Sequence, residues 1–250
     1  MKITITNIGQ EFNTTAAWRI IAQILGKKNS VIGLSTGRTT GGIHAAVADV
    51  YKKFPFDASQ VTVFNLDELT NVPREYFGGC YTMIRNEICI PMGIPEENII
   101  MPPTISDNFE EEGRLFEERI MQRGGIDLQV LGIGENGHLG FNQPGTPFER
   151  TTWLSVMDTP LEERVRRETQ SPKDANLGGL TLGIKNIMQS RKIVLVANGA
   201  RKADIIKAAL LGPVTVDVPA SVLQLHPDCE AILDVEAAAG ILLVLQQNKH

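Results

Sequence analysis

Cysteine is scarce in this chain, and its spacing excludes two kinds of cross-linked scaffold. The 250 residues include three cysteines, Cys80, Cys89 and Cys229, and no C-x-x-C pair occurs. An odd number without paired spacing supports neither a disulfide framework nor a zinc site. We therefore expect buried thiols in a protein of the reducing cytoplasm, with no metal and no other cofactor.

Long apolar runs and an excess of basic charge are also missing. The longest late apolar stretch, 237–245, contains Gly240 and is too short to cross a membrane. The amino terminus has no apolar core of a signal peptide. The net charge is −5, whereas a general nucleic-acid binder is normally basic. We expect neither a membrane nor a nucleic acid as a partner.

Strand-like and helix-like segments alternate along the whole chain, which is typical of βαβ units and a mainly parallel sheet. With 42% hydrophobic residues, the chain can bury a substantial core, and we expect a single α/β domain over residues 1–250. The expected strands are 30–34, 61–66, 126–133, 153–157, 192–197 and, at an edge, 230–234. The expected helical segments are 14–25, 43–53, 81–90, 109–123, 184–189, 200–211, 220–225 and 237–247.

The most informative segment follows the strand 126–133. Residues 131–145 read LGIGENGHLGFNQPG, in which glycines surround Asn136, His138 and Gln143. Glycine lets a backbone approach a ligand closely, and ligands bind beyond the carboxyl ends of strands in open α/β sheets. We expect a binding or catalytic site here, rather than a turn with a satisfied histidine. The G-x-G-x-x-G pattern at 132–137 is a dinucleotide fingerprint only before a helix, and Pro144 and the further glycines argue against one.

Two other loops join a strand to a helix. Residues 35–42 read STGRTTGG, a glycine and threonine loop whose N–H groups and hydroxyls suit a phosphate. The alternative is a flexible polar turn. Lys202 lies in the first turn of the helix 200–211, where a cation opposes the helix dipole. An anion bound nearby would explain this position, and a surface lysine is the alternative.

Charged residues mark two more positions. Asp67 and Glu68 follow the strand 61–66, where a carboxylate can transfer protons. The alternatives are a solvated charge pair or a helix cap. Arg164, Arg166 and Arg167 form a basic cluster among glutamates, which favours an exposed helix face over a phosphate ligand.

These loops, in this order, resemble the glucosamine-6-phosphate deaminase/isomerase family, whose close relatives are the 6-phosphogluconolactonases. The likeness extends from about 18 to 234, and its most specific parts are FNLDE at 64–68, residues 131–144, and LQLHP at 223–227. The Phe-Asn-x-Pro after Gly-His-Leu-Gly points to the deaminase side. The family implies a modified doubly wound, Rossmann-like α/β fold, with helices on both faces of a mainly parallel sheet.

The resemblance also implies roles for individual residues. Asp67 matches the base that moves a proton between C2 and C1 of an opened sugar, and His138 matches the histidine that assists ring opening. The remaining matches form the expected substrate and phosphate site, which consists of Thr36, Gly37, Arg38, Thr39, Glu68, Gly137, Arg164 and Lys202. The match to the family's arginine is left open among Arg164, Arg166 and Arg167.

The chain departs from the family at two positions beside the histidine. The deaminases carry acids where this chain has Asn136 and Gln143, which we count with Asp67 and His138 as the catalytic group. Neutral amides cannot stabilise an imidazolium by charge. The galactosamine-phosphate branch of the family also resembles this chain in having Asn before Gly-His. Thr152 and Leu154 stand where allosteric deaminases carry basic effector ligands, so we expect no activator site.

We interpret the chain as a cytoplasmic amino-sugar-6-phosphate isomerase/deaminase, most like the galactosamine-6-phosphate type. It would convert an aldose amino-sugar 6-phosphate into a ketose phosphate with ammonia release. The alternatives are a 6-phosphogluconolactonase or a catalytically weakened sugar-phosphate sensor. A small-molecule sugar phosphate is the expected partner, homo-oligomers are compatible with the sequence, and the sequence leaves the preferred C4 epimer open.

Overall fold

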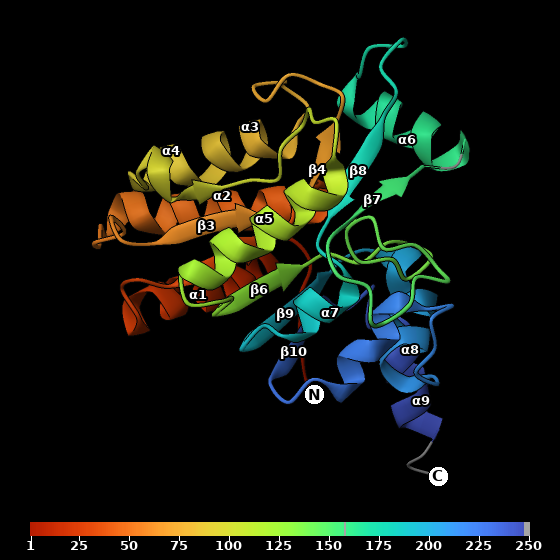
Figure 1. Ribbon diagram of the computed structural model, residues 1–250. Helices are drawn as coiled ribbons and strands as arrows, with labels where there is room; N and C mark the ends of the chain where they lie inside the picture. Colours follow the sequence, from red (N-terminus) through yellow and green to blue (C-terminus); the bar gives the residue numbers. More distant parts are fainter. Residues whose placement is uncertain (158, 248–250) are drawn as a thin grey trace.

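The computed structural model describes residues 1–157 and 159–247, and within them the strands form a seven-stranded sheet and a three-stranded sheet (Figure 1). The main sheet is parallel at every strand pair, and its order is β1-β10-β9-β6-β2-β3-β5. Its strands are β1 (Lys2–Thr6), β2 (Val31–Leu34), β3 (Thr62–Asn65), β5 (Ile99–Ile100), β6 (Leu128–Leu131), β9 (Lys192–Ala197) and β10 (Cys229–Asp234).

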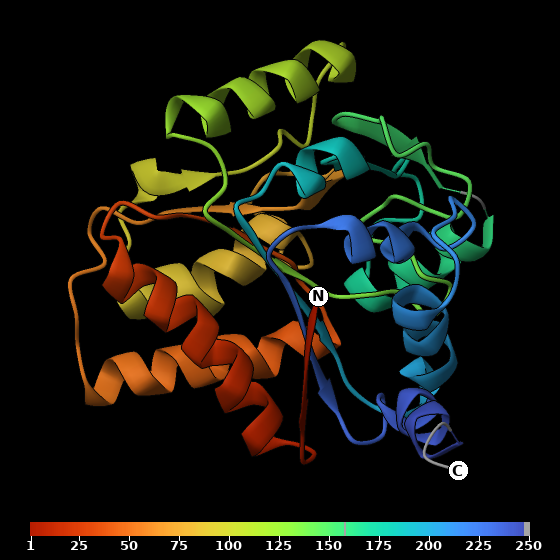
Figure 2. The same ribbon diagram turned by 90° about the horizontal axis from the view of Figure 1, so that it is seen from below.

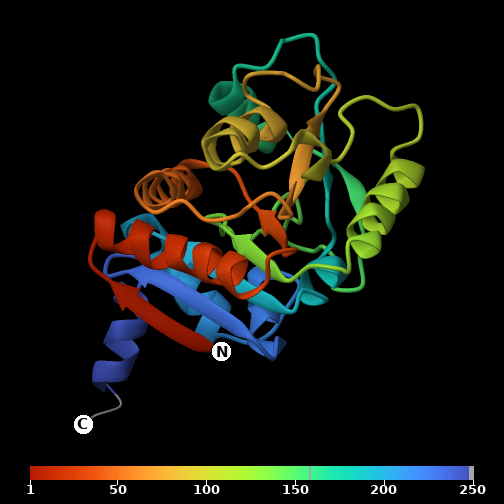
Figure 3. The same cartoon turned by 90° about the vertical axis from the view of Figure 1, so that its left-hand side faces the viewer.

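The helices cover both faces of this sheet (Figures 2 and 3). One face carries α1 (Gln10–Gly26), α2 (Arg38–Lys53) and the segment in which α3 (Cys80–Ile84), a π-helix (Arg85–Cys89) and α4 (Ile90–Met92) follow one another. The other face carries α5 (Phe109–Gln122), α7 (Ile184–Met188), α8 (Ala203–Leu211), α9 (Ala239–Gln247) and a 3-10 helix (Pro219–Leu225). Short 3-10 turns occupy Glu96–Asn98 and Ala200–Lys202. The expected doubly wound α/β fold is confirmed.

Alternate residues of the central strands enter opposite cores. Phe64 and Leu131 pack on the α5 side, whereas Val63 and Val130 pack on the α1 side. Because both faces are covered, β2, β3 and β6 are buried throughout, and most of their residues are apolar. This is why the sequence shows them as mainly apolar segments.

The direction of winding reverses between β2 and β6. The chain passes outward from β2 through β3 to β5, then returns to place β6 on the other side of β2 and continues to β9 and β10. Such a switch point opens a crevice beyond the carboxyl ends of the two strands, where ligands bind in sheets of this kind. The loops that follow β2 and β6 are therefore the first place to look for a site.

The small sheet lies beyond β3 and has the order β4-β8-β7 (Figure 1). It consists of the antiparallel strands β4 (Asp67–Thr70), β8 (Gly178–Thr181) and β7 (Trp153–Val156). The helix α6 (Thr159–Thr169) packs on it through Val165, which contacts a cluster that includes Leu69 and Leu177. The small sheet thus holds α6 at the carboxyl edge of the main sheet.

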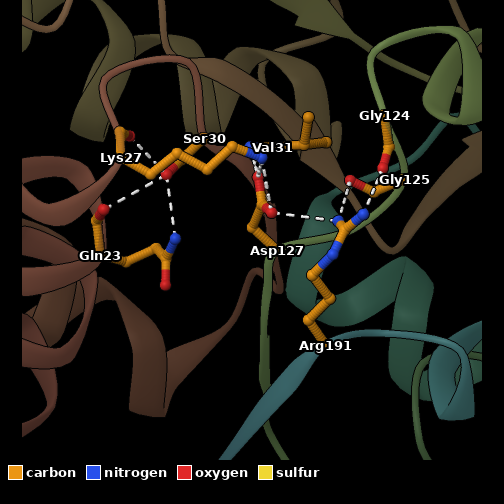
Figure 4. Close-up of polar contacts among 8 residues, drawn as sticks. All are labelled: Gln23, Lys27, Ser30, Val31, Gly124, Gly125, Asp127 and Arg191. Atoms are coloured by element: carbon orange, nitrogen blue, oxygen red, sulfur yellow. Dashed lines mark hydrogen bonds and ion pairs between the residues drawn. The ribbon is translucent and has the colours of Figure 1, made fainter.

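The opposite, amino edge is held by a buried carboxylate (Figure 4). Asp127 is 4% exposed and precedes β6. It accepts hydrogen bonds from Lys27 Nζ at 2.7 Å, from Arg191 Nη1 at 3.0 Å and from the Val31 backbone N–H at 2.8 Å. These contacts join the end of α1 to the first residues of β2, β6 and β9.

Two expectations from the sequence are wrong. The strand 230–234 is not at an edge, because the unpredicted β1 pairs with β10 on its outer side (Figure 3). The loop 35–42 is shorter than expected, because α2 begins at Arg38 and includes the last two glycines. By contrast, the described residues 132–145 contain no helix. The G-x-G-x-x-G pattern at 132–137 therefore lacks the helix that a dinucleotide site needs, as expected from the sequence.

Candidate active site

Loops after four neighbouring strands meet at the carboxyl edge of the main sheet. They follow β2, β3, β6 and β9, which stand in the order β9-β6-β2-β3. Side chains join the loops directly, because Thr39 Oγ1 donates to Asn198 Oδ1 at 2.7 Å and Lys202 Nζ donates to the Ile133 carbonyl at 2.6 Å. Segments that are far apart in the sequence therefore build one site at the switch point.

The amino terminus of α2 supplies an anion-binding end. Gly37 is its N-cap and has φ +143°, a backbone conformation that glycine alone adopts without strain. The first N–H groups of a helix lack intrahelical acceptors, and the helix dipole favours negative charge there. The hydroxyl groups of Thr36 and Thr39, next to Gly37 and Arg38 in the chain, donate to Cys80 Sγ at 3.1 Å and to Asn198 Oδ1 at 2.7 Å.

Cations from separate elements surround the same end. Arg38 begins α2, Arg164 comes from α6, and Lys202 precedes α8. Burial lowers the pKa of Lys202, and the charges of Arg164 and Arg38 lower it further, although Glu135 opposes them. Arg38 also approaches Glu168 at 3.6 Å. Positive charge is thus concentrated here in a chain whose net charge is −5.

The three arginines of the basic cluster have different surroundings. The charge of Arg164 acts on both His138 and Lys202. Arg166 instead bonds Glu162 on its own helix and the carbonyls of Pro172 and Ala175, and Arg167 is exposed. We therefore expect Arg164 to be the arginine of this cluster that serves the site.

Asp67 lies at the start of β4, directly beyond β3. Its Oδ1 accepts hydrogen bonds from Asn65 Nδ2 at 3.2 Å and from the Cys80 thiol at 3.7 Å. Burial raises the pKa of Asp67 to about 7, and the neighbouring Glu68 also raises it. A carboxyl group that is half ionised at neutral pH is well matched to general-base catalysis.

Glu68 lies beneath the site and has no exposed side-chain surface. Its carboxylate accepts from the backbone N–H groups of Leu69 at 2.9 Å, Cys80 at 2.8 Å and Tyr81 at 2.7 Å. Two of these groups belong to the first turn of α3, so Glu68 caps that helix. The geometry supports a positioning role for Glu68, and does not support the substrate contact that the resemblance implied.

The histidine loop approaches Asp67 closely at Gly140. A Cβ on Gly140, which has φ +58°, would lie 3.0 Å from Asp67 Oδ2 and 2.9 Å from Leu66. Earlier in the same loop, the Gly137 carbonyl accepts a hydrogen bond from the Ala220 N–H at 2.9 Å, which fixes the position of Gly137. The glycines therefore bring the loop backbone beside the carboxylate.

A chain of amides orients the imidazole of His138. Its Nδ1 lies 2.6 Å from Asn136 Oδ1, which also accepts the backbone N–H of His138 at 3.2 Å. Asn136 Nδ2 in turn donates to Gln143 Oε1 at 3.0 Å. Because Gln143 engages the amide nitrogen, the oxygen of Asn136 faces the ring, and this network assigns the proton to Nδ1 and the free lone pair to Nε2.

His138 is uncharged at neutral pH in this setting. Burial lowers its pKa to about 4, and the charges of Arg164 and Lys202 lower it further. Neither Asn136 nor Gln143 provides a negative charge to oppose this shift. The site thus pairs a raised carboxyl pKa with a lowered imidazole pKa, a combination that assigns different proton-transfer roles to two groups.

Comparison with known proteins identifies the family of this chain. A family model described as glucosamine-6-phosphate isomerases/6-phosphogluconolactonase matches residues 7–232. The chain belongs to this family. The resemblance that the sequence motifs predicted is confirmed, and with it the prediction that the protein is an enzyme of this kind.

Several relatives cover almost the whole chain. Glucosamine-6-phosphate deaminase of Clostridium botulinum (strain Loch Maree / Type A3) is 38% identical over 243 residues, 97% of this chain and 100% of that protein. The deaminase of Thermoanaerobacter pseudethanolicus is 38% identical over 96% of this chain and 95% of its own length. A solved structure of a monomeric glucosamine-6-phosphate deaminase has a TM-score of 0.91 at 29% identity and covers 96% of this chain and 100% of its own.

A lactonase shares the fold. The 6-phosphogluconolactonase from Trypanosoma cruzi has a TM-score of 0.78 at 18% identity, with 96% of each chain covered. At this identity the likeness shows the fold alone. The lactonase alternative therefore has to be judged on the site.

The structure adds two side chains to those that the sequence predicts for this site. Asn65 and Cys80 contact Asp67 directly. The motif FNLDE contains Asn65, but no pattern in the sequence predicts that α3 brings Cys80 to the same carboxylate. Within residues 1–157 and 159–247, no group of His, Cys, Asp and Glu side chains is arranged to hold a metal ion.

Proposed function

We propose that this protein is an amino-sugar-6-phosphate isomerase and deaminase that converts galactosamine 6-phosphate or glucosamine 6-phosphate into a ketose 6-phosphate and ammonia. The observation that carries the proposal is the position of Asp67. A carboxyl group with a pKa of about 7 is linked through Cys80 to Thr36, directly before the amino terminus of α2, and the charges of Arg38 and Arg164 act on Lys202 nearby. Relatives at 38% identity named glucosamine-6-phosphate deaminase support the same reaction class.

The phosphate is held by the anion-binding end of the site. The N–H groups of residues 37–39 and the charges of Arg164 and Lys202 bind it. Anchoring the C6 phosphate there directs the other end of the sugar toward Asp67 and His138. Fixing both ends of a small substrate removes much of the entropic cost of reaching the transition state.

Asp67 carries the proton between two carbons. In the opened sugar its carboxylate takes the proton from C2 while the aldehyde oxygen on C1 gains a proton from solvent, which leaves an enolamine with a double bond between C1 and C2. It then returns the proton to C1, the amino nitrogen on C2 loses a proton to solvent, and the amino group becomes an imine. Water adds to that imine and ammonia leaves, which gives the ketose phosphate.

His138 opens the ring. Its free Nε2 accepts the proton of the C1 hydroxyl and passes it to the ring oxygen, so the imidazole begins and ends neutral. Asn136 and Gln143 hold the required tautomer without adding negative charge. This arrangement suits a sugar that opens readily, and together with the asparagine before Gly-His it supports galactosamine 6-phosphate as the preferred substrate.

The proposal places the enzyme in the cytoplasm, acting on a small-molecule sugar phosphate. In the part of the chain that the structure describes, no helix is long and apolar enough to cross a bilayer. One structural relative is described as monomeric, and nothing in the mechanism requires a second copy of the chain.

The test is a parallel assay on both amino-sugar phosphates, with hydrolysis of 6-phosphogluconolactone measured beside it. We expect ammonia and ketose phosphate in equal amounts, and a higher kcat/KM for galactosamine 6-phosphate. Hydrolysis of the lactone without ammonia release would establish the lactonase alternative. Binding of either sugar phosphate without turnover would instead establish a sugar-phosphate sensor. The uncharged side chains of Asn136 and Gln143 are the feature that favours this alternative.

A further inference from the structure

Cys80 lies between the anion-binding loop and the base of the proposed reaction. It begins α3 and is 8% exposed. Its Sγ accepts the hydroxyl proton of Thr36 at 3.1 Å and donates to Asp67 Oδ1 at 3.7 Å. The thiol therefore connects the loop after β2 with the carboxylate after β3.

This thiol is a hydrogen-bond donor and not a nucleophile. Burial raises the pKa of Cys80 well above its usual range, and the charges of Glu68 and Asp67 raise it further. The sulfur therefore keeps its proton throughout the neutral range. Reactive cysteines have the opposite property, a lowered pKa that populates the thiolate.

The two oxygens of Asp67 have different surroundings. Oδ1 accepts from Asn65 and from Cys80. Oδ2 faces the backbone of Gly140, so closely that a Cβ there would lie 3.0 Å from the oxygen. Among the described residues no hydrogen bond is donated to Oδ2, so its lone pairs are free to take a proton from carbon.

We propose that Cys80 is a positioning residue, which holds Asp67 Oδ1 so that Oδ2 is the oxygen that carries the substrate proton. The proposal rests on the proposed function for the role of Asp67 as a base. The hydrogen bonds from Cys80 and Asn65 favour the ionised carboxylate, so they lower the pKa of Asp67, whereas burial raises it.

The experiment follows the carboxyl carbon signal of Asp67 through a pH titration by ¹³C NMR. The Asp67→Asn variant, which lacks the signal, provides its assignment. Cys80→Ala removes the donor, so the pKa of Asp67 should rise by about half a unit to one unit, the modest range expected of a weak S–H donor. Cys80→Ser restores a donor and should keep the pKa at or below the wild-type value. Cys89→Ala, at a buried position in the π-helix that follows α3, is the control and should not shift it.

The pH dependence of ammonia release gives a second measurement. For a rise of one unit from about 7, the ionised fraction of Asp67 at pH 7 falls from about one half to about one tenth, so kcat should fall about fivefold. At pH 9 the wild type and Cys80→Ala should converge. KM should stay within about twofold, because the thiol does not hold the phosphate.

The outcomes separate this inference from the proposed function. A folded Cys80→Ala protein with an unchanged Asp67 titration would overturn the inference, and so would equal rises in the alanine and serine variants, which would indicate packing instead of donation. Absence of ammonia release by the wild type would overturn the proposed function. The titration would still show whether Cys80 holds Oδ1.

Discussion

Two residues of the site titrate far from their ordinary ranges, in opposite directions. Burial raises the pKa of Asp67 to about 7 and lowers that of His138 to about 4. Near neutral pH the carboxylate is therefore available as a base, while the imidazole exchanges protons as a neutral group. The side chains around them decide these values, and substitutions there give the sharpest tests.

Replacing the base should separate chemistry from binding. Asp67→Asn should lower kcat by about 10²–10⁴, the usual contribution of a general base. KM should change by no more than about threefold, because the phosphate contacts remain. Steady-state kinetics measure both values, and wild-type turnover in a folded Asp67→Asn protein would remove this residue from the mechanism.

The same substitution should change the pH dependence of stability. The pKa of Asp67 is raised in the folded state, so ionising it destabilises the fold, by an amount that grows from about pH 4 and is complete above about pH 7. Asp67→Asn should therefore unfold at a higher temperature than the wild type at pH 8, with a smaller difference at pH 5. Thermal unfolding at the two pH values checks this, and an equal difference at both would contradict it.

Restoring negative charge beside the histidine should speed ring opening. In the double variant Asn136→Asp with Gln143→Glu, an anion contacts the imidazole, so the pKa of His138 should rise from about 4. Turnover on glucosamine 6-phosphate should increase, with less effect on a sugar that opens by itself. NMR titration and ammonia release measure the two effects. Gln122→Glu, an exposed change on α5, serves as the control. A folded double variant that is no faster on either epimer would contradict this account.

At the scale of elements, we expect the amino terminus of α2 to be the main anion-binding part of the site. Its geometry depends on Gly37, whose φ of +143° is strained for any residue with a Cβ. Gly41 lies one turn further along the same helix, with no atom within 4 Å of the position of its Cβ. These two glycines form a matched pair for mutation.

Gly37→Ala should raise KM for the sugar phosphate about tenfold or more, because a strain of roughly 1–3 kcal/mol redirects the N–H groups that bind the anion. Gly41→Ala should leave KM unchanged and stabilise the helix by about 0.5–1 kcal/mol. Kinetics and thermal unfolding of both variants test the pair. Equal KM values in Gly37→Ala and the wild type would show that the helix end does not bind the phosphate.

The elements also show how far sequence could predict this structure. The strands β2, β3, β6 and β9 are buried on both faces and are visible as apolar runs. By contrast, β8 reads GGLT and β4 begins at the acidic pair after β3, so neither has a strand-like pattern of its own. Antiparallel pairing between them creates the small sheet, and such long-range pairing is not encoded locally.

Side-chain contacts of the site show the same limit. Asp67 and His138 were identified from motifs, because their chemistry depends on a few adjacent residues. The choice of Arg164 over Arg166 depends on carbonyls at Pro172 and Ala175, and the role of Cys80 depends on how α3 packs. Those contacts are fixed by tertiary structure, so sequence left the first open and missed the second.

At the scale of the whole molecule, the two edges of the main sheet have different tasks. The carboxyl edge carries the displaced pKa values of Asp67 and His138, which cost stability. The amino edge carries the network around Asp127, which ties four elements together (Figure 4). Stability and activity should therefore respond separately to mutations at the two edges.

Asp127→Asn tests this separation. Loss of the carboxylate leaves Lys27 and Arg191 without their anion and should lower the free energy of unfolding by about 2–4 kcal/mol. Turnover should stay within about twofold of the wild type, since the site lies at the other edge. Asp49→Asn, an exposed change on α2, should alter stability by less than about 0.5 kcal/mol. A large loss of kcat in a folded Asp127→Asn protein would contradict the separation.

The most direct test of the account is isotope incorporation during turnover in D₂O. If Asp67 exchanges its proton with solvent while it moves the proton from C2 to C1, the ketose phosphate formed from galactosamine 6-phosphate should carry deuterium at C1. One ammonia should be released for each ketose phosphate formed. The Asp67→Asn variant should form neither product at a comparable rate. Ammonia release by the wild type with no deuterium at C1, or undiminished incorporation in Asp67→Asn, would contradict proton transfer by this carboxylate.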